Sequence, residues 1–149
     1  MNKDITYLAG KMSGLSVEEM CRWRNEFKLK FKNHCEQEGI HNPFNIVSPT
    51  DFYSFEEKKH KTEKEVMDYD LWLIKNSTLV VVNLDYPNSI GTAIELYEAN
   101  KHCNIPVIGF GTIINHPWIE ECVTVKFDSM DEVINYIFEF YIPHVAGNY

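Results

Sequence analysis

The sequence predicts one α/β domain, because short apolar segments alternate with amphipathic ones along the chain. Its 149 residues are a usual domain length, and 44% of them are apolar, which is enough to bury a core. Residues 78–84 are continuous, apolar and β-branched, as expected for a central parallel strand covered on both faces. Five strands separated by helices indicate a flavodoxin-like, doubly wound parallel sheet with the strand order 2-1-3-4-5. We expect a single domain over residues 1–149.

Two strands and two helices are expected before the central strand. Ser16 and Glu19 form a capping box, and apolar residues follow it at helical spacing. A proline ends the short second strand. The expected segments are a strand at 5–10, a helix from 17, a strand at 45–49 and a helix from about 55 to 76.

The second half of the chain continues the alternation. Asn88 or Ser89 can cap a third helix that runs to about His102, with its core stripe formed by Ile90, Ala93, Ile94 and Tyr97. A further capping box opens the last helix. The remaining expected segments are strands at 106–111 and 123–127 and a helix from 129 to about 141.

Charge and hydropathy exclude two classes of partner. The formal net charge is −8 and no stripe of basic residues offsets it, so we expect no binding to a nucleic-acid backbone. A local pocket on an acidic protein can still bind one phosphate. No apolar run approaches the roughly 18 to 20 residues that span a membrane. No signal peptide is visible at the start of the sequence, so we expect a cytoplasmic protein.

The cysteines predict reduced thiols rather than a metal site. None of the four forms a CxxC pair. Cys35 follows His34 and Cys103 follows His102, but adjacent residues rarely both reach one metal. We therefore expect no metal, and thiols that stay reduced as in the cytosol.

The functional site is expected at the carboxyl ends of the strands, where the strand order reverses. The loops at 10–14 and 85–92 meet there, and neither carries a large-family phosphate motif. Glu95 lies off the expected core stripe of the third helix, and Gly91 leaves room for a ligand near its backbone. A carboxylate held there can attack the C1 carbon of a sugar. On the residues alone, a solvated helix glutamate is the alternative.

Three segments together resemble the nucleoside 2-deoxyribosyltransferase superfamily, over nearly the whole chain. They are YLAGKMSG at 7–14, Asp70 with the following Ile74, and NLD at 83–85 followed by SIGTAIEL at 89–96. The resemblance implies that Glu95 is the nucleophile, that the Tyr7 hydroxyl orients it, and that Asp70 handles the nucleobase proton. The alternatives are a core aromatic at Tyr7 and a capping or surface aspartate at Asp70.

The position six residues before Glu95 bears on the substrate. Nucleoside transferases commonly carry an aspartate there, which binds the sugar 5′-hydroxyl, whereas this chain has Ser89. Related members that act on nucleoside 5′-monophosphates resemble this chain in having a serine, which can donate to a phosphate. Ser89 can equally be a plain helix cap. The other expected substrate-binding residues are Gly10, Lys11, Ser13, Asn83 and Gly91.

The resemblance also implies a homo-oligomer. Residues 147–149 look like the terminal segment that reaches a neighbour's active site in several deoxyribosyltransferases. Aromatic side chains near the end of the chain predict a subunit interface, with core packing as the alternative. These aromatic residues are Trp118, Tyr136, Phe138, Phe140 and Tyr141.

The expected function is cleavage of the N-glycosidic bond of a nucleoside or deoxynucleoside through a covalent Glu95–sugar intermediate, and transfer of the sugar to another nucleobase. One alternative is a 2′-deoxynucleoside 5′-monophosphate N-glycosidase, with water as acceptor and Ser89 on the phosphate. Another is a non-catalytic nucleotide-binding module. No cofactor is expected, because the carboxylate can do the chemistry alone.

Overall fold

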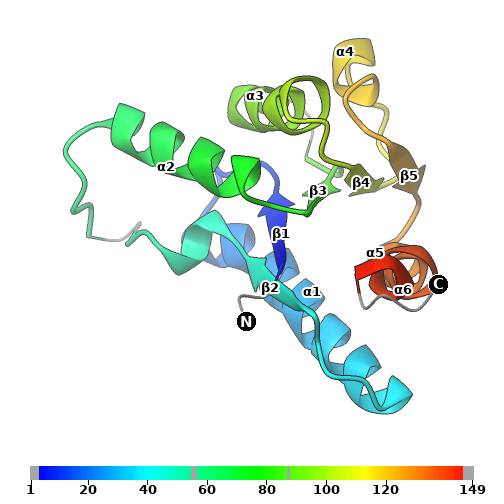
Figure 1. Cartoon of the computed structure of the whole chain (residues 1–149). Helices are drawn as coiled ribbons and strands as arrows, with labels where there is room; N and C mark the ends of the chain where they lie inside the picture. The colour runs from blue at the N-terminus through cyan, green and yellow to red at the C-terminus, as the bar shows by residue number, and fades with distance from the viewer. Residues whose placement is uncertain (1–3, 55–56, 87, 146–149) are drawn as a thin grey trace.

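The computed structural model describes residues 4–54, 57–86 and 88–145. Five parallel strands form one sheet in the order β2-β1-β3-β4-β5, which confirms the predicted flavodoxin-like topology (Figure 1). The strands are β1 (Asp4–Ala9), β2 (Phe44–Val47), β3 (Leu79–Asn83), β4 (Val107–Phe110) and β5 (Val125–Phe127).

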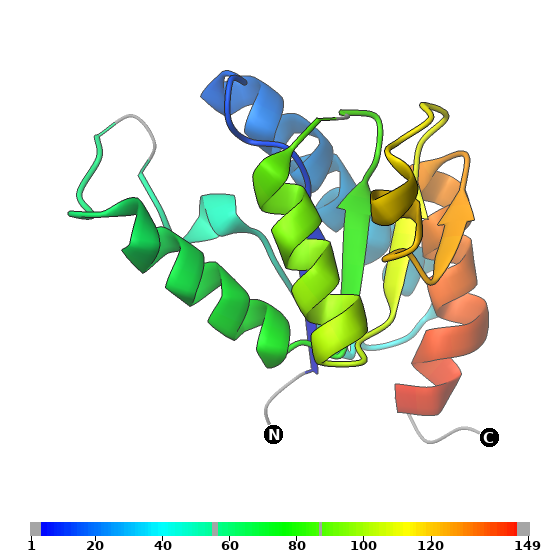
Figure 2. The same ribbon diagram turned by 90° about the horizontal axis from the view of Figure 1, so that it is seen from above.

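Helices cover both faces of this sheet (Figure 2). The face with α1 and α5 packs Phe27 and Val133 against Leu8 and Val81, and the opposite face packs α2 and α3 against alternate strand residues. The helices are α1 (Val17–Glu38), α2 (Glu63–Lys75), α3 (Ile90–Tyr97), α4 (Pro117–Glu120), α5 (Met130–Tyr136) and α6 (Ile142–Val145), with a 3₁₀ turn η1 (Pro49–Asp51) and π-helical segments η2 (Glu98–His102) and η3 (Ile137–Tyr141).

The caps set where the helices begin. The Ser16 hydroxyl accepts the Glu19 amide, as the sequence predicts. The prediction that the second helix begins near residue 55 is wrong, because a capping box of Thr62 and Glu65 starts α2 at Glu63. Phe55 itself lies outside the described residues.

The expected core stripe of α3 is also wrong. The exposed fraction is 82% for Ile90, 40% for Ile94 and 61% for Tyr97, whereas Thr92 and Leu96 are buried. Leu96 belongs to the core cluster that includes the β3 side chains. The helix therefore packs its less apolar face, which carries Thr92 and Leu96, against the sheet. The α3 surface is therefore unusually apolar for a helix face open to solvent.

The aromatic residues near the end of the chain are mostly part of the core. Phe138 packs on Phe31 at a centroid distance of 5.0 Å, and Tyr136 packs on Phe127 at 5.2 Å. Tyr141 also packs against the core, as in the alternative of core packing, although all three side chains are only partly buried. The subunit interface stays a prediction. Trp118 and Phe140 are exposed. The predicted contact at residues 147–149 lies outside the described residues.

Alternation along β1 decides which side of the sheet carries the functional groups. Leu8 belongs to the cluster under α1 and α5, whereas its neighbour Tyr7 belongs to the cluster under α2 and α3. Tyr7 is fully buried there. In the described part of the chain, no helix is both long and apolar enough to cross a membrane.

Candidate active site

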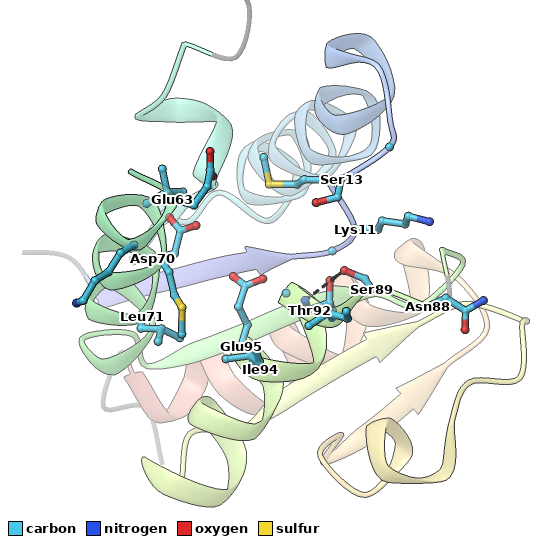
Figure 3. Close-up of a pocket in the computed structure, with 18 residues that line it drawn as sticks. Lys11, Ser13, Glu63, Asp70, Leu71, Asn88, Ser89, Thr92, Ile94 and Glu95 are labelled. Atoms are coloured by element: carbon cyan, nitrogen blue, oxygen red, sulfur yellow. Dashed lines mark hydrogen bonds between the residues drawn. The ribbon is translucent and has the colours of Figure 1, made fainter. Parts of the chain in front are cut away.

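A cavity of about 850 Å³ lies where the sequence predicts a site, beyond the carboxyl ends of β1 and β3. Its walls are the loop at residues 10–14, one face of α2 and the first turns of α3 (Figure 3). Glu95 lines it from α3 and Asp70 from α2, and Figure 3 shows both carboxyl groups projecting into the space between these helices. The structure thus brings together residues that are distant in the sequence.

Tyr7 and Glu95 form the central contact of the site. The Tyr7 hydroxyl donates a short hydrogen bond to Oε2 of the half-buried Glu95. Burial raises the pKa of Glu95 to about 7, and nearby Asp70 adds to the rise, while the Tyr7 hydrogen bond and Arg24 oppose it. Burial and then Glu95 raise the pKa of Tyr7 well above its usual value. Tyr7 therefore remains a hydrogen-bond donor at neutral pH.

Asp70 provides the second carboxyl group, on the facing helix. Its buried Oδ1 atom accepts no hydrogen bond from the part of the chain that the structure describes. Burial raises the pKa of Asp70 to about 6, against a hydrogen bond with Tyr53 and the charge of Arg24, which lower it. A buried polar atom without a partner is unfavourable unless a ligand satisfies it. Asp68, two residues earlier, is exposed and bonded to Lys64 instead.

Ser89 is both a helix cap and part of the cavity wall. Its Oγ accepts the Thr92 amide at 3.2 Å and the Thr92 hydroxyl at 2.8 Å. Both bonds use lone pairs of the serine oxygen, so its own proton is left to donate. Lys11, Ser13 and Gly91 also line the cavity.

Two other residues that the sequence predicts to bind substrate, Gly10 and Asn83, have structural roles in the loops after β1 and β3. A Cβ atom on Gly10 would lie 2.9 Å from the Trp23 ring, so glycine lets α1 pack against this loop while Gly10 lines the cavity. Asn83 does not line the cavity. Its side-chain Oδ1 accepts the Asp85 amide at 2.9 Å and so builds the turn after β3.

Arg24 is a charged residue of this region that the sequence interpretation missed. Its side chain is fully buried under the loop and donates to the carbonyl oxygens of Gly10 at 3.0 Å and Met20 at 2.7 Å. Its charge favours the ionised forms of Glu95 and Asp70. The available signal was a charged residue on an apolar helix stripe, four positions after Met20 and three before Phe27.

Fold and site together define a doubly wound α/β protein with two carboxyl groups facing one another across its switch-point cavity. No protein-family model matches the chain, and no curated protein matches it. Solved structures do match. A conserved protein from Enterococcus faecalis V583 has a TM-score of 0.74 at 13% identity, covering 93% of this chain and 99% of that one.

Two further matches have stated activities. A 2-deoxyribosyltransferase from Bacillus psychrosaccharolyticus has a TM-score of 0.63 at 20% identity, covering 89% of this chain and 91% of its own. The CMP N-glycosidase BcmB from Clostridium botulinum has a TM-score of 0.53 at 15% identity, covering 92% and 100%. At these identities the likeness establishes a shared fold, in agreement with the resemblance found in the sequence motifs.

Proposed function

We propose that this protein cleaves the N-glycosidic bond of a nucleoside or nucleotide, with Glu95 as the nucleophile. The observation that carries the proposal is the Tyr7–Glu95 hydrogen bond facing Asp70 in one cavity. The shared fold with a 2-deoxyribosyltransferase and a CMP N-glycosidase supports it. A fold alone does not define a reaction, so the argument depends on these side chains.

The geometry suits a double displacement. Tyr7 holds Oε2 of Glu95, so Oε1 is the oxygen that attacks C1′. The electron pair of the breaking C1′–N bond goes to the nucleobase, which takes a proton from Asp70. The ionised carboxylate stabilises the positive charge that develops at C1′ before it bonds to that carbon. An incoming base or water then gives its proton to the ionised Asp70 and bonds to C1′ as the Glu95 carboxylate leaves, so the configuration at C1′ is retained.

We propose transfer of the sugar to another nucleobase as the reaction, with hydrolysis of a 5′-monophosphate as the second candidate. One observation favours the second candidate. Ser89 lines the cavity at the start of α3 with a proton left to donate, and Lys11 lies on the cavity wall. A phosphate accepts hydrogen bonds at such a helix start, where a carboxylate would repel it.

The proposal is tested by trapping the intermediate. Incubation with a 2-fluoro-2-deoxynucleoside or its 5′-monophosphate should add one sugar to the intact mass, and peptide mapping should place it on Glu95. Glu95→Gln should prevent the adduct, whereas Glu121→Gln, an exposed glutamate outside the cavity, should not. If the protein forms no adduct and shows no turnover but still binds a nucleotide, the proposal is wrong and the protein is a nucleotide-binding module.

A second assay separates the two reactions. A deoxynucleoside is offered together with a different free nucleobase, and a deoxynucleoside 5′-monophosphate is offered alone. Transfer yields a new nucleoside in the first mixture. Hydrolysis yields free base and a sugar phosphate in the second.

A homo-oligomer remains a proposal. On α2 and α3 the side chains of Trp72 and Tyr97 are exposed, as are Ile90 and Ile94, which line the cavity. Exposed apolar residues that gather on one side of a molecule often mark an interface. Light scattering on the purified protein tests this, and Tyr97→Glu should reduce the molar mass to that of a monomer.

A further inference from the structure

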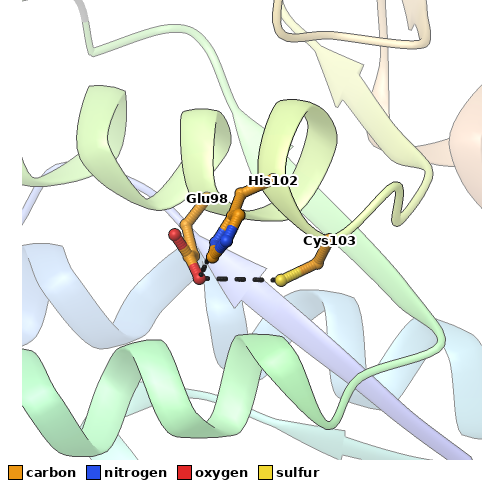
Figure 4. A group of neighbouring side chains, drawn as sticks. All are labelled: Glu98, His102 and Cys103. Atoms are coloured by element: carbon orange, nitrogen blue, oxygen red, sulfur yellow. Dashed lines mark hydrogen bonds and ion pairs between the residues drawn. The ribbon is translucent and has the colours of Figure 1, made fainter.

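A second cluster of coordinating side chains lies outside the cavity, where α3 passes into η2. The ligand atoms of Glu98, His102 and Cys103 all lie within 4.8 Å of one another (Figure 4). Oε1 of Glu98 lies 2.8 Å from Nδ1 of His102 and 3.6 Å from Sγ of Cys103. One carboxylate oxygen therefore faces both a nitrogen and a sulfur donor.

The π-helical turn explains how two adjacent residues reach the same point. In an α-helix the neighbour of residue 98 is residue 102, and residue 103 points away. Here the Cys103 amide bonds to the Glu98 carbonyl at 2.9 Å, five positions earlier. This wider turn places Cys103 beside Glu98 as well. His102 and Cys103 can therefore both reach one ion although they are adjacent in the sequence. Single π-turns occur frequently at functional sites.

The donor set has the chemistry of a zinc-type site. Carboxylate oxygen, imidazole nitrogen and thiolate sulfur bind Zn²⁺ at about 2.0 to 2.3 Å, so donors around one ion lie roughly 3 to 4 Å apart. The ligand atoms of the cluster, within 4.8 Å of one another, are close to that spacing. A thiolate and a carboxylate together balance the charge of a divalent ion. Most of the His102 side chain is exposed, which leaves an open side for water as a fourth ligand.

We propose that Glu98, His102 and Cys103 bind a divalent ion of the Zn²⁺ or Co²⁺ class, at a site separate from the Glu95 chemistry. On binding, the Cys103 S–H bond breaks, a sulfur–metal bond forms and the thiol proton goes to solvent. The Nδ1 proton of His102 moves to Nε2 by exchange with solvent, which frees the Nδ1 lone pair for the metal. Burial and then Glu98 raise the pKa of the Cys103 thiol, while the Lys75 charge lowers it. The ion replaces the hydrogen bonds that Glu98 now accepts from its two neighbours.

Cobalt titration of the reduced full-length protein tests the site. Co²⁺ alone should produce a thiolate-to-cobalt charge-transfer band, and Zn²⁺ should then remove it. Cys103→Ser should abolish the band, and His102→Gln or Glu98→Gln should weaken binding. Cys21→Ser, on α1, is the matched control and should leave the band unchanged. A wild-type protein without the band, or a band that survives in Cys103→Ser, would overturn the proposal. Should Cys103→Ser fail to fold, the other two variants decide the outcome.

A separate observation concerns the buried guanidinium of Arg24. Besides the bonds to Gly10 and Met20, its Nε lies 3.5 Å from the Leu8 carbonyl and its charge lies over the Trp23 ring. In the described ranges no carboxylate lies within ion-pair distance of it, although a buried unpaired cation is unfavourable. Burial lowers the pKa of Arg24, and the acidic groups that oppose this are Glu95, Tyr7, Cys21 and Asp70.

We infer that Arg24 is a positioning residue, which anchors the cavity loop through the Gly10 carbonyl and whose buried charge favours the ionised form of Glu95. The inference rests on the proposed role of Glu95. The groups around that carboxyl are Tyr7 on β1, Asp70 on α2 and Arg24 on α1. Arg24 is the cation of this set, so its loss removes the opposing charge from both carboxyl groups.

Carbon NMR of ¹³C-labelled glutamate tests this without requiring activity, so it separates failure of this inference from failure of the proposed function. The Glu95 signal is assigned by its loss in Glu95→Gln. Arg24→Gln retains donors but no charge, and should move the Glu95 titration to higher pH. Arg24→Lys should restore much of the wild-type midpoint. An unchanged midpoint in folded Arg24→Gln would overturn the inference. If that variant is unfolded, a midpoint in Arg24→Lys that lies well above the wild-type value would overturn it.

Discussion

The hydroxyl of Tyr7 donates a hydrogen bond to Glu95 across 88 positions of the chain. Tyr7 comes from the buried strand β1, and Glu95 comes from the helix α3 that follows β3. The contact therefore exists only when α3 packs on the face of the sheet to which the Tyr7 side chain points. It leaves one carboxylate oxygen of Glu95 directed at the cavity. The first prediction follows from this contact.

Tyr7→Phe should lower kcat/KM with little loss of folding, because the phenyl ring fits the buried space and only the hydroxyl is lost. A hydrogen bond to a charged group contributes about 1.5 to 3 kcal/mol, which corresponds to roughly a 10- to 100-fold loss of rate. Steady-state kinetics with the substrate identified by the trapping experiment measure this. Tyr53→Phe removes a hydrogen bond to Asp70 instead and should have a smaller effect. An unchanged rate in Tyr7→Phe would contradict the role of the contact.

The pH dependence should be bell-shaped. Glu95 must be ionised to attack, and its pKa is about 7, whereas Asp70 must be protonated to act as an acid, and its pKa is about 6. The reactive combination is therefore a minor form that is most populated between pH 6 and 7, and kcat/KM should peak there. The two limbs belong to the coupled pair rather than to either residue alone.

Asp70→Asn tests the assignment of the alkaline limb. The variant should be slower, and its rate should no longer fall at high pH, because the group that must stay protonated has been removed. Asp68→Asn is the matched control on the same helix and should keep the bell-shaped profile. An alkaline limb that persists unchanged in Asp70→Asn would show that another group provides the proton.

Glu95→Gln should abolish activity and yet stabilise the protein at alkaline pH. Burial raises the folded-state pKa of Glu95 from 4.5 to about 7, so the folded protein binds this proton more tightly than the unfolded chain. The stabilisation that the protonated Glu95 gives to the folded state is therefore fully present below pH 4.5 and is lost as the pH rises through about 7. Glutamine cannot ionise, and its amide oxygen can still accept from Tyr7.

The gain should reach at most about 3 kcal/mol at pH 8, because each tenfold difference in proton affinity corresponds to about 1.4 kcal/mol. Thermal or urea unfolding of both proteins at pH 5 and pH 8 measures it. The stability difference between variant and wild type should grow towards pH 8. A difference that is constant with pH would mean that Glu95 is not buried in solution.

Ser89→Asp separates the two roles of this residue. Aspartate is as good a helix cap as serine, so the start of α3 should remain stable, whereas Ser89→Ala should cost about 1 kcal/mol. The added carboxylate should raise KM for a 5′-monophosphate at least about tenfold, since that factor corresponds to only 1.4 kcal/mol of repulsion. The KM for the matching nucleoside should change little. Equal effects on both substrates would argue against a phosphate at Ser89.

Local sequence patterns predicted much of the fold because they report on neighbouring residues. The continuous apolar run of β3 and the cap at Ser16 depend on a few adjacent positions, and both are present as expected. The start of α2 and the buried face of α3 were predicted incorrectly. In α3 the apolar residues Ile90 and Tyr97 lie exposed, so hydrophobic spacing alone pointed to the wrong face.

By itself, the sequence determined the alternation of strands and helices, the parallel order of the sheet and the loops that must meet at its carboxyl edge, because these follow from periodicity and chain connectivity. Only the tertiary structure decided which side of the sheet Tyr7 occupies, that Arg24 lies buried beneath the cavity, and that Oδ1 of Asp70 has no hydrogen-bond partner among the described residues. Those facts depend on packing between elements far apart in the chain. No local pattern encodes the distance between such residues or the polarity of their surroundings.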